Sequence, residues 1–250
     1  MNTLLIFLLY LATLTSVKAE QPTKRYVWNK SGIPVYASSQ MGKATDTLRY
    51  GFAIEDLEEI SILEETILFS APPQETAGTV ACLPYSHLSK WYRIRYEGGA
   101  GYIKDTYLMA IPPPMDYGAY IPIYEYLAQL ADILSEAHQG QTEESCEHDT
   151  YTFSNGAYYC FTDLGPCESC GESIAETYLP GLDAHQGFLF MMVVHNIPMD
   201  NNEPSEDPYH SGMVYFYPQA DGSLKFLTDY NEYTITERDG GILIFDHMVM

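Results

Sequence analysis

The residues whose side chains could do the most chemistry are five cysteines. Four of them fall close together in the C-terminal half of the chain. These four are Cys146, Cys160, Cys167 and Cys170. In an oxidising compartment such cysteines are disulfide candidates, and four of them allow three connectivities, among which sequence does not choose. Cys82 is then the odd cysteine, either buried as a small apolar group or paired across domains.

Two further interpretations of these cysteines follow from their type. The Cys-x-x-Cys at residues 167–170, followed by a helix-like segment, is a feature of thiol oxidoreductases. However, Glu168 and Glu172 disfavour a thiolate there, and no strand–helix–strand pattern surrounds the motif. The four cysteines also have the ligand type of a zinc site, although their spacing is irregular.

A cysteine nucleophile also needs a histidine base, and the chain has seven histidines. A papain-like wall peptidase could use Cys170 as the nucleophile, with His185 or His195 as the base. The Asp-Cys-Ser type of sequence found around that family's nucleophile is missing here. His195 ends an apolar run, where a satisfied core histidine is the commoner case. No catalytic residue is therefore assigned, and the peptidase is kept as an alternative.

One acidic loop could bind a cation. Its candidate ligands are Asp200, Asn202, Glu203 and Asp207. Carboxylate and amide oxygens suit Ca²⁺, but the loop lacks the spacing and central glycine of an EF-hand. A solvated connection between strands explains the same composition, and no other cofactor is expected.

An aromatic and basic strand provides the candidate binding face. In an alternating strand, Tyr92, Ile94 and Tyr96 share one side, while the other side carries Trp91 followed by two arginines. With Ile94 marking the core, Trp91 is expected outward or in a groove, where it could stack on a peptide or sugar. The alternative is that Trp91 caps a small barrel. The candidate binding residues are Trp91, Arg93, Arg95, Tyr36, Tyr50 and Tyr102.

Residues 91–107, together with residues 35–38 and the Leu48 and Gly51 step, resemble the bacterial SH3-like domains of exported and wall-associated proteins. The resemblance covers about a third of the chain. It implies a small β-barrel that binds a ligand and does no chemistry. Two departures are the absence of a basic residue and Gly-Pro after the first strand, and the extra residues 57–90, which are an elaboration or a partial repeat.

Charge and hydropathy divide the chain into four parts. Residues 1–19 are predicted to be a secretory signal cleaved before Glu20, and no other segment is apolar enough to cross a membrane. Residues 20–111 form the SH3-like domain and 112–116 a proline-rich linker. Residues 117–250 form an acidic domain. Residues 112–250 carry two basic residues against 23 acidic ones, a net charge of −21, which argues against nucleic acid and anionic membrane surfaces as partners. Such a charge attracts a cationic protein, a basic peptide or Ca²⁺, and the alternative is that it only keeps a secreted protein soluble.

The acidic domain shows one helix pattern and several strand patterns. A helix is predicted over residues 122–138, because one face carries apolar residues at helical spacing: Ile123, Leu127, Leu130 and Leu134. The apolar run 187–195 indicates a buried strand. Turn signals predict three hairpins, over residues 151–161, 213–227 and 233–245.

The sequence therefore predicts a mainly β fold, an N-terminal SH3-like small β-barrel followed by an α+β domain with an antiparallel sheet. The expected function is that of an exported, non-enzymatic binding or adaptor protein of the cell envelope, periplasmic or extracellular. Its ligand would be a peptide, a wall fragment or a protein. The alternatives are a Cys-dependent wall peptidase and an acidic inhibitor or immunity-type protein that binds a cationic partner.

Overall fold

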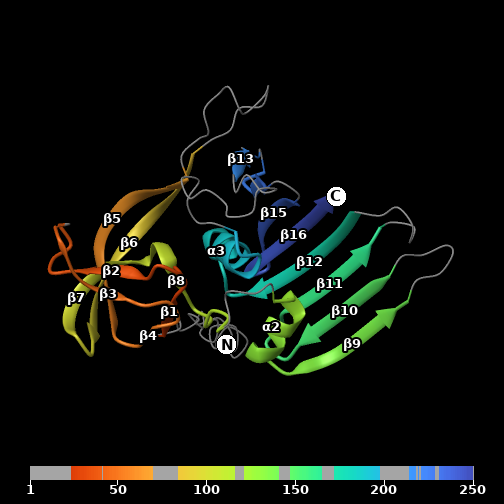
Figure 1. Ribbon diagram of the computed structural model, residues 1–250, viewed down its shortest axis with the longest axis horizontal. Helices are drawn as coiled ribbons and strands as arrows, with labels where there is room; N and C mark the ends of the chain where they lie inside the picture. The colour runs from red at the N-terminus through yellow and green to blue at the C-terminus, as the bar shows by residue number, and fades with distance from the viewer. Residues whose placement is uncertain are drawn as a thin grey trace, which may run out of the picture.

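The protein is mainly β in a computed structural model, and all strand pairs among the described residues are antiparallel (Figure 1). The structure describes residues 24–40, 42–69, 84–115, 121–140, 147–164, 172–197, 214–217, 219, 221–228 and 231–249. The predicted signal sequence, Cys82, Cys146, Cys167, Cys170 and the proposed calcium ligands lie outside these residues.

We use the name first domain for the described residues up to 111 and second domain for those from 121 onward. The first domain contains two small sheets around one apolar core. The strands of the three-stranded sheet, in spatial order, are β4 (Ala53–Ile54), β1 (Arg25–Val27) and β8 (Leu108–Met109). Those of the five-stranded sheet are β3 (Ala44–Leu48), β2 (Ile33–Tyr36), β7 (Gly99–Lys104), β6 (Tyr85–Tyr96) and β5 (Leu57–Phe69). Neither sheet closes into a barrel. A 3₁₀ turn, η1 (Asp105–Tyr107), leads from β7 into β8.

The extra residues of the first domain lengthen its longest hairpin. Within 57–90, the described residues belong almost entirely to β5 and β6, which pair from Leu57↔Ile94 to Phe69↔Tyr85. The hairpin ends in aromatic residues that reach the second domain: the ring of Phe69 lies 5.8 Å from Phe188, and that of Tyr85 lies 4.6 Å from Phe188. The extension therefore joins the two domains.

The proline stretch is held in place between the domains. Tyr50 of the first domain donates its hydroxyl to the carbonyl of Pro114 at 3.0 Å, and Tyr126 of the second donates to that of Pro112. Trp28 also donates to the carbonyl of Ile111 at 2.8 Å. These bonds, together with buried Pro113 and Pro114, make the described part of the linker a packed connection.

The second domain is built from an element order that occurs twice, which the sequence analysis did not predict. We call α2 (Ile123–Leu130) with β9 (Ile133–Gln139), β10 (His148–Phe153), β11 (Tyr158–Asp163) and β12 (Glu172–Pro180) the α2 half. We call α3 (Ala184–Val194) with β13 (Tyr215–Tyr217), β14 (Leu224–Leu227), β15 (Asn231–Arg238) and β16 (Gly241–Val249) the α3 half. The two last strands, β12 and β16, pair antiparallel and join the halves into one eight-stranded sheet, in the order β13-β14-β15-β16-β12-β11-β10-β9.

The helix predicted over residues 122–138 is half as long as expected. Ile123 and Leu127 are buried as predicted, but α2 ends at Leu130 and Ala131 takes an extended backbone. The remaining residues form β9, an edge strand that pairs with β10 and leaves Leu134 70% exposed. Leu134 continues the helical spacing by coincidence. Residues 133–139 form a strand because their backbone pairs with β10.

The buried strand predicted over residues 187–195 is wrong, because this segment is helix α3. Asp183 caps it in a capping box with Gln186, and nine of its eleven residues are buried. A helix that is apolar on all sides has no amphipathic period and cannot be distinguished from a buried strand by pattern. It is buried all round because it lies between the first domain and the eight-stranded sheet (Figure 1).

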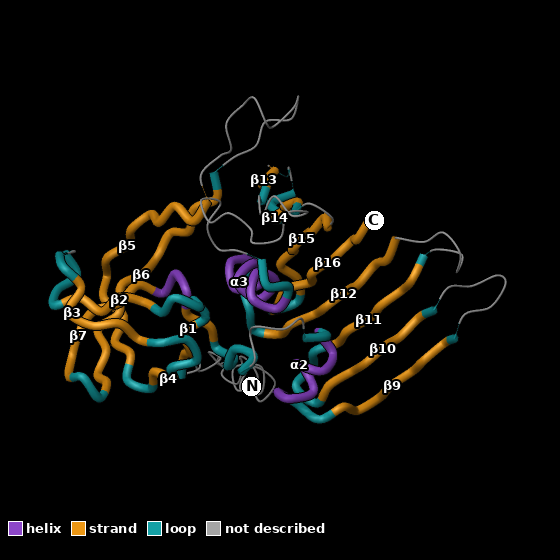
Figure 2. The backbone as a smooth tube through the Cα atoms, in the orientation of Figure 1, coloured by secondary structure: helices purple, strands orange, loops and turns teal. Residues whose placement is uncertain are grey.

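The three predicted hairpins are confirmed as β10–β11, β13–β14 and β15–β16. Both helices lie on the same face of the eight-stranded sheet (Figure 2). No helix among the described residues is long and apolar enough to span a membrane.

Candidate functional site

Trp91 is fully buried, which corrects the expectation that it faces outward. As predicted, Ile94 lies in the core of the first domain with Tyr92 and Tyr96 packed against it, and Trp91 is on the opposite side of β6. That side is covered too. The Trp91 indole donates to Glu64 at 3.0 Å, Lys104 lies 5.4 Å from its ring centre, and the ring of Tyr36 lies 5.5 Å away.

The other candidate binding residues do not form one face with Trp91. Arg93 and Arg95 are exposed, but each lies within 4 Å of a carboxylate on or next to β5, Glu58 at 3.6 Å and Asp56 at 3.7 Å. Tyr36 and Tyr102 are half-buried cross-strand partners, and Tyr50 binds the proline stretch. The structure therefore brings Tyr36 to Trp91 as packing, and it separates Tyr50 from both.

His185 joins the two domains. Its Nε2 lies 2.7 Å from the carbonyl of Thr106 and its Nδ1 lies 3.0 Å from the hydroxyl of Tyr85, so Nε2 carries the proton and Tyr85 donates to Nδ1. The ring stacks on His87 at 3.6 Å, and His87 lies 3.5 Å from Asp105. Burial, together with the neighbouring His87, lowers the pKa of His185 to about 3. Both ring nitrogens hold the domain interface, so neither is available as a base.

His195 follows α3 as its C-cap residue, and its side chain is 14% exposed. Its Nε2 lies 3.5 Å from Oδ2 of Asp246, whose Oδ1 accepts a hydrogen bond from Asn231 at 2.8 Å. Burial lowers the pKa of His195 to about 4 and raises that of Asp246 to about 6. This polar group lies among core residues, with the ring of Tyr233 5.5 Å from His195, and it is not open to a substrate.

Of the four disulfide candidates, Cys160 is the one within the described residues, and there it is a free thiol. Its sulfur lies 3.7 Å from Nε2 of His148 on the neighbouring strand, and Thr162 lies 2.9 Å from Nδ1 of the same histidine. Sequence reasoning missed His148, whose link to Cys160 depends on the hairpin register. The disulfide predictions for the other cysteines remain predictions.

We call the side of the eight-stranded sheet away from the helices the outer face. No described helix or strand covers it. The strand alternation places Tyr158 beside Tyr178, with ring centres 5.7 Å apart, and puts Phe245 next to Glu176. All these side chains are half-buried. The members on the three central strands are Tyr158, Cys160, Thr162, Ile174, Glu176, Tyr178, Leu243, Phe245 and His247.

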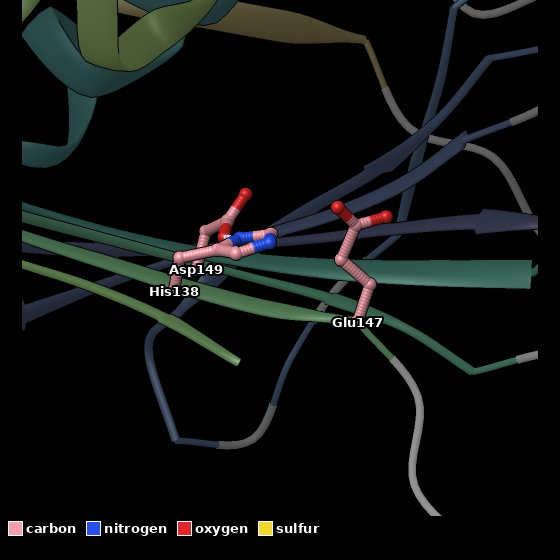
Figure 3. A group of neighbouring side chains, drawn as sticks. All are labelled: His138, Glu147 and Asp149. Atoms are coloured by element: carbon pink, nitrogen blue, oxygen red, sulfur yellow. Dashed lines mark hydrogen bonds and ion pairs between the residues drawn. The ribbon is translucent and has the colours of Figure 1, made fainter. Parts of the chain in front are cut away.

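A second polar cluster lies at the far end of the other face (Figure 3). Figure 3 shows the His138 imidazole near the carboxylates of Asp149 and Glu147. The ligand atoms of these three residues lie within 4.8 Å of one another. Sequence reasoning missed this group as well, because Asp149 faces His138 only through the pairing of β9 with β10.

Comparison with models of known protein families, with curated proteins and with solved structures finds no match to this chain.

Proposed function

We propose that this chain is an exported, non-enzymatic binding protein of the cell envelope, whose acidic domain holds a cationic protein on the outer face of its eight-stranded sheet. The observation that carries this proposal is the outer face itself. Aromatic and aliphatic side chains such as Tyr178 and Phe245 lie half-exposed at its centre, with no described element over them.

The shape of the outer face favours a protein over a small ligand. Small molecules bind in concave sites, whereas a sheet eight strands wide presents a broad surface. Specific protein interfaces combine an apolar, aromatic centre with a polar rim. Tyr158, Tyr178 and Phe245 would supply the centre here.

Charge indicates which class of protein would bind. The net charge of −21 on residues 112–250 attracts a basic partner and repels an acidic one. Glu176 lies beside Phe245 at the centre of the face and would meet a lysine or arginine of that partner.

The first domain, in this proposal, is a bacterial SH3-like module that has lost the exposed tryptophan face. Its support is the resemblance of residues 91–107 and the two small sheets around one core. Because Trp91 is buried, the partner surface is assigned to the second domain. The role of this module is then to pack against α3.

Site-specific photo-crosslinking in the exporting cell tests the proposal. A photoreactive phenylalanine analogue at Tyr178 should crosslink one basic protein, and the crosslink should weaken at high salt. The matched control is the same analogue at Leu88, which is 58% exposed on the first domain. Equal crosslinking from both positions, an acidic product, or crosslinking only to a second copy of this chain would refute the cationic partner. Protein recovered outside the cell should begin at Glu20.

A thiol-dependent wall peptidase is the second candidate, favoured by the contact of Cys160 with His148. It predicts that folded protein hydrolyses wall peptides and that Cys160→Ser abolishes this, while Thr150→Ser does not. Under the binding proposal, neither the parent chain nor the two variants should hydrolyse wall peptides.

A further inference from the structure

Three side chains with metal-binding atoms meet where β9 ends and β10 begins. His138 and Asp149 are directly opposite each other in the pairing of these strands. Glu147 precedes Asp149 by two residues and so projects from the same side of the sheet. This is the side that carries α2, but the cluster lies at the opposite end of the strands, and two of its three residues are exposed.

The surroundings of the cluster leave its negative charge almost uncompensated. Residues 112–250 contain only two basic residues, Lys225 and Arg238, and these pair with Glu232 at 2.6 Å and Asp239 at 3.2 Å in the α3 half. Within the cluster, the imidazole of His138 contacts the carboxylate of Asp149. A divalent cation at this place would offset the charge of the two carboxylates.

We propose that His138, Glu147 and Asp149 bind a divalent first-row transition-metal ion, with Zn²⁺ as the representative. Imidazole nitrogen and carboxylate oxygen are ligands that Zn²⁺ takes together, whereas Ca²⁺ selects oxygen alone. Three protein ligands leave at least one position for water. The ligand atoms already lie within 4.8 Å of one another, so side-chain rotation alone could bring them around one ion.

The chain contains an internal comparison for this site. His247 on the outer face lies 2.7 Å from the carboxylate of Glu172, in a partly exposed His–carboxylate pair like that of His138 and Asp149. No third ligating group joins this pair among the described residues. If an exposed His–carboxylate pair were enough to bind the metal, both places would bind it.

Titration of the mature chain with Co²⁺ and Zn²⁺, followed by calorimetry and by the visible spectrum of bound Co²⁺, tests the proposal. We expect one saturable site without a thiolate-to-cobalt charge-transfer band. His138→Ala and Asp149→Asn should each weaken binding at least about tenfold, since even outer-shell changes at metal sites cost about 10- to 100-fold. His247→Ala should leave it unchanged, and Ca²⁺ should not compete.

Three results would overturn the proposal: no saturable binding, equal losses for His247→Ala and His138→Ala, or a thiolate band, which would assign the metal to cysteines. Because the cluster and the outer face lie on opposite sides of the sheet, this inference goes beyond the proposed binding function. Partner crosslinking at Tyr178 can therefore fail while metal binding persists, and the reverse.

Discussion

The α2 half and the α3 half share one element order but differ in what covers their helices. In the α2 half, the helix buries one side, including Tyr126 and Leu127, and leaves Gln129 exposed. In the α3 half, nine of eleven helix residues are buried. The first domain covers the side of α3 that corresponds to the solvent-exposed side of α2. The same topology therefore carries a readable amphipathic pattern in one half and none in the other.

This difference shows that the first domain is part of the core of the second. Trp28 lies 6.2 Å from Phe190 of α3, and Phe69 and Tyr85 pack on Phe188. His185 adds hydrogen bonds to Tyr85 and Thr106 across the same interface. We expect the two domains to unfold together, with α3 as the shared element.

The largest effect should come from truncating α3. Phe188→Ala removes a fully buried ring that contacts both domains, so it should lower the free energy of unfolding by about 3–5 kcal/mol. Gln129→Ala, on the exposed side of α2, should stay within about 0.5 kcal/mol. Urea unfolding followed by fluorescence and circular dichroism measures both, and similar small costs for the two variants would break the comparison.

A smaller effect, on the order of 3 kcal/mol, should follow from lowering the pH from 6.5 to 4. His185 and His195 have folded pKa values of about 3 and about 4, below the ordinary 6.5. The unfolded chain therefore binds protons first, and stability is lost as the pH falls through this window. Asp246, with its pKa raised to about 6, opposes part of the loss because it takes up its proton in the folded state.

The pH effect should belong to the α3 half. His138 of the α2 half has a raised pKa, so its contribution is present at low pH and is lost as the pH rises through that pKa. Urea midpoints across the pH range should show a shallower acid loss in His185→Gln than in the parent chain. An unchanged slope would place the acid sensitivity elsewhere.

How much the sequence predicts depends on how local each signal is. The hairpins were predicted because turns such as Asn155-Gly156 and Asp239-Gly240 lie between their strands. Helix α3 was missed because burial on all sides removes the helical period. The pairing of His138 with Asp149, and the role of His185, depend on contacts between separate strands and between domains, which no single segment encodes.

Within the first domain, the same comparison can be made between buried Trp91 and exposed Arg93, with an expected effect on stability of roughly 1–3 kcal/mol for Trp91. Trp91→Phe removes the indole donor to Glu64 and part of a buried ring, so it should reduce stability by that amount. Arg93→Ala breaks only an exposed ion pair and should cost less than about 1 kcal/mol. A stable Trp91→Phe protein that loses its partner would instead restore Trp91 as a binding residue.

The smallest effect distinguishes the observed edge strand from the predicted helix. Leu134 is 70% exposed on β9, and threonine suits an exposed strand, so Leu134→Thr should change stability by no more than about 0.5 kcal/mol. If the helix continued to His138, Leu134 would share the buried side of Leu127, and truncating a buried leucine costs about 2–5 kcal/mol. Leu127→Ala, on the true helix, supplies that larger cost as the control in the same urea titration. A small change in the free energy of unfolding for Leu134→Thr together with a large one for Leu127→Ala therefore locates the end of α2 between these two residues.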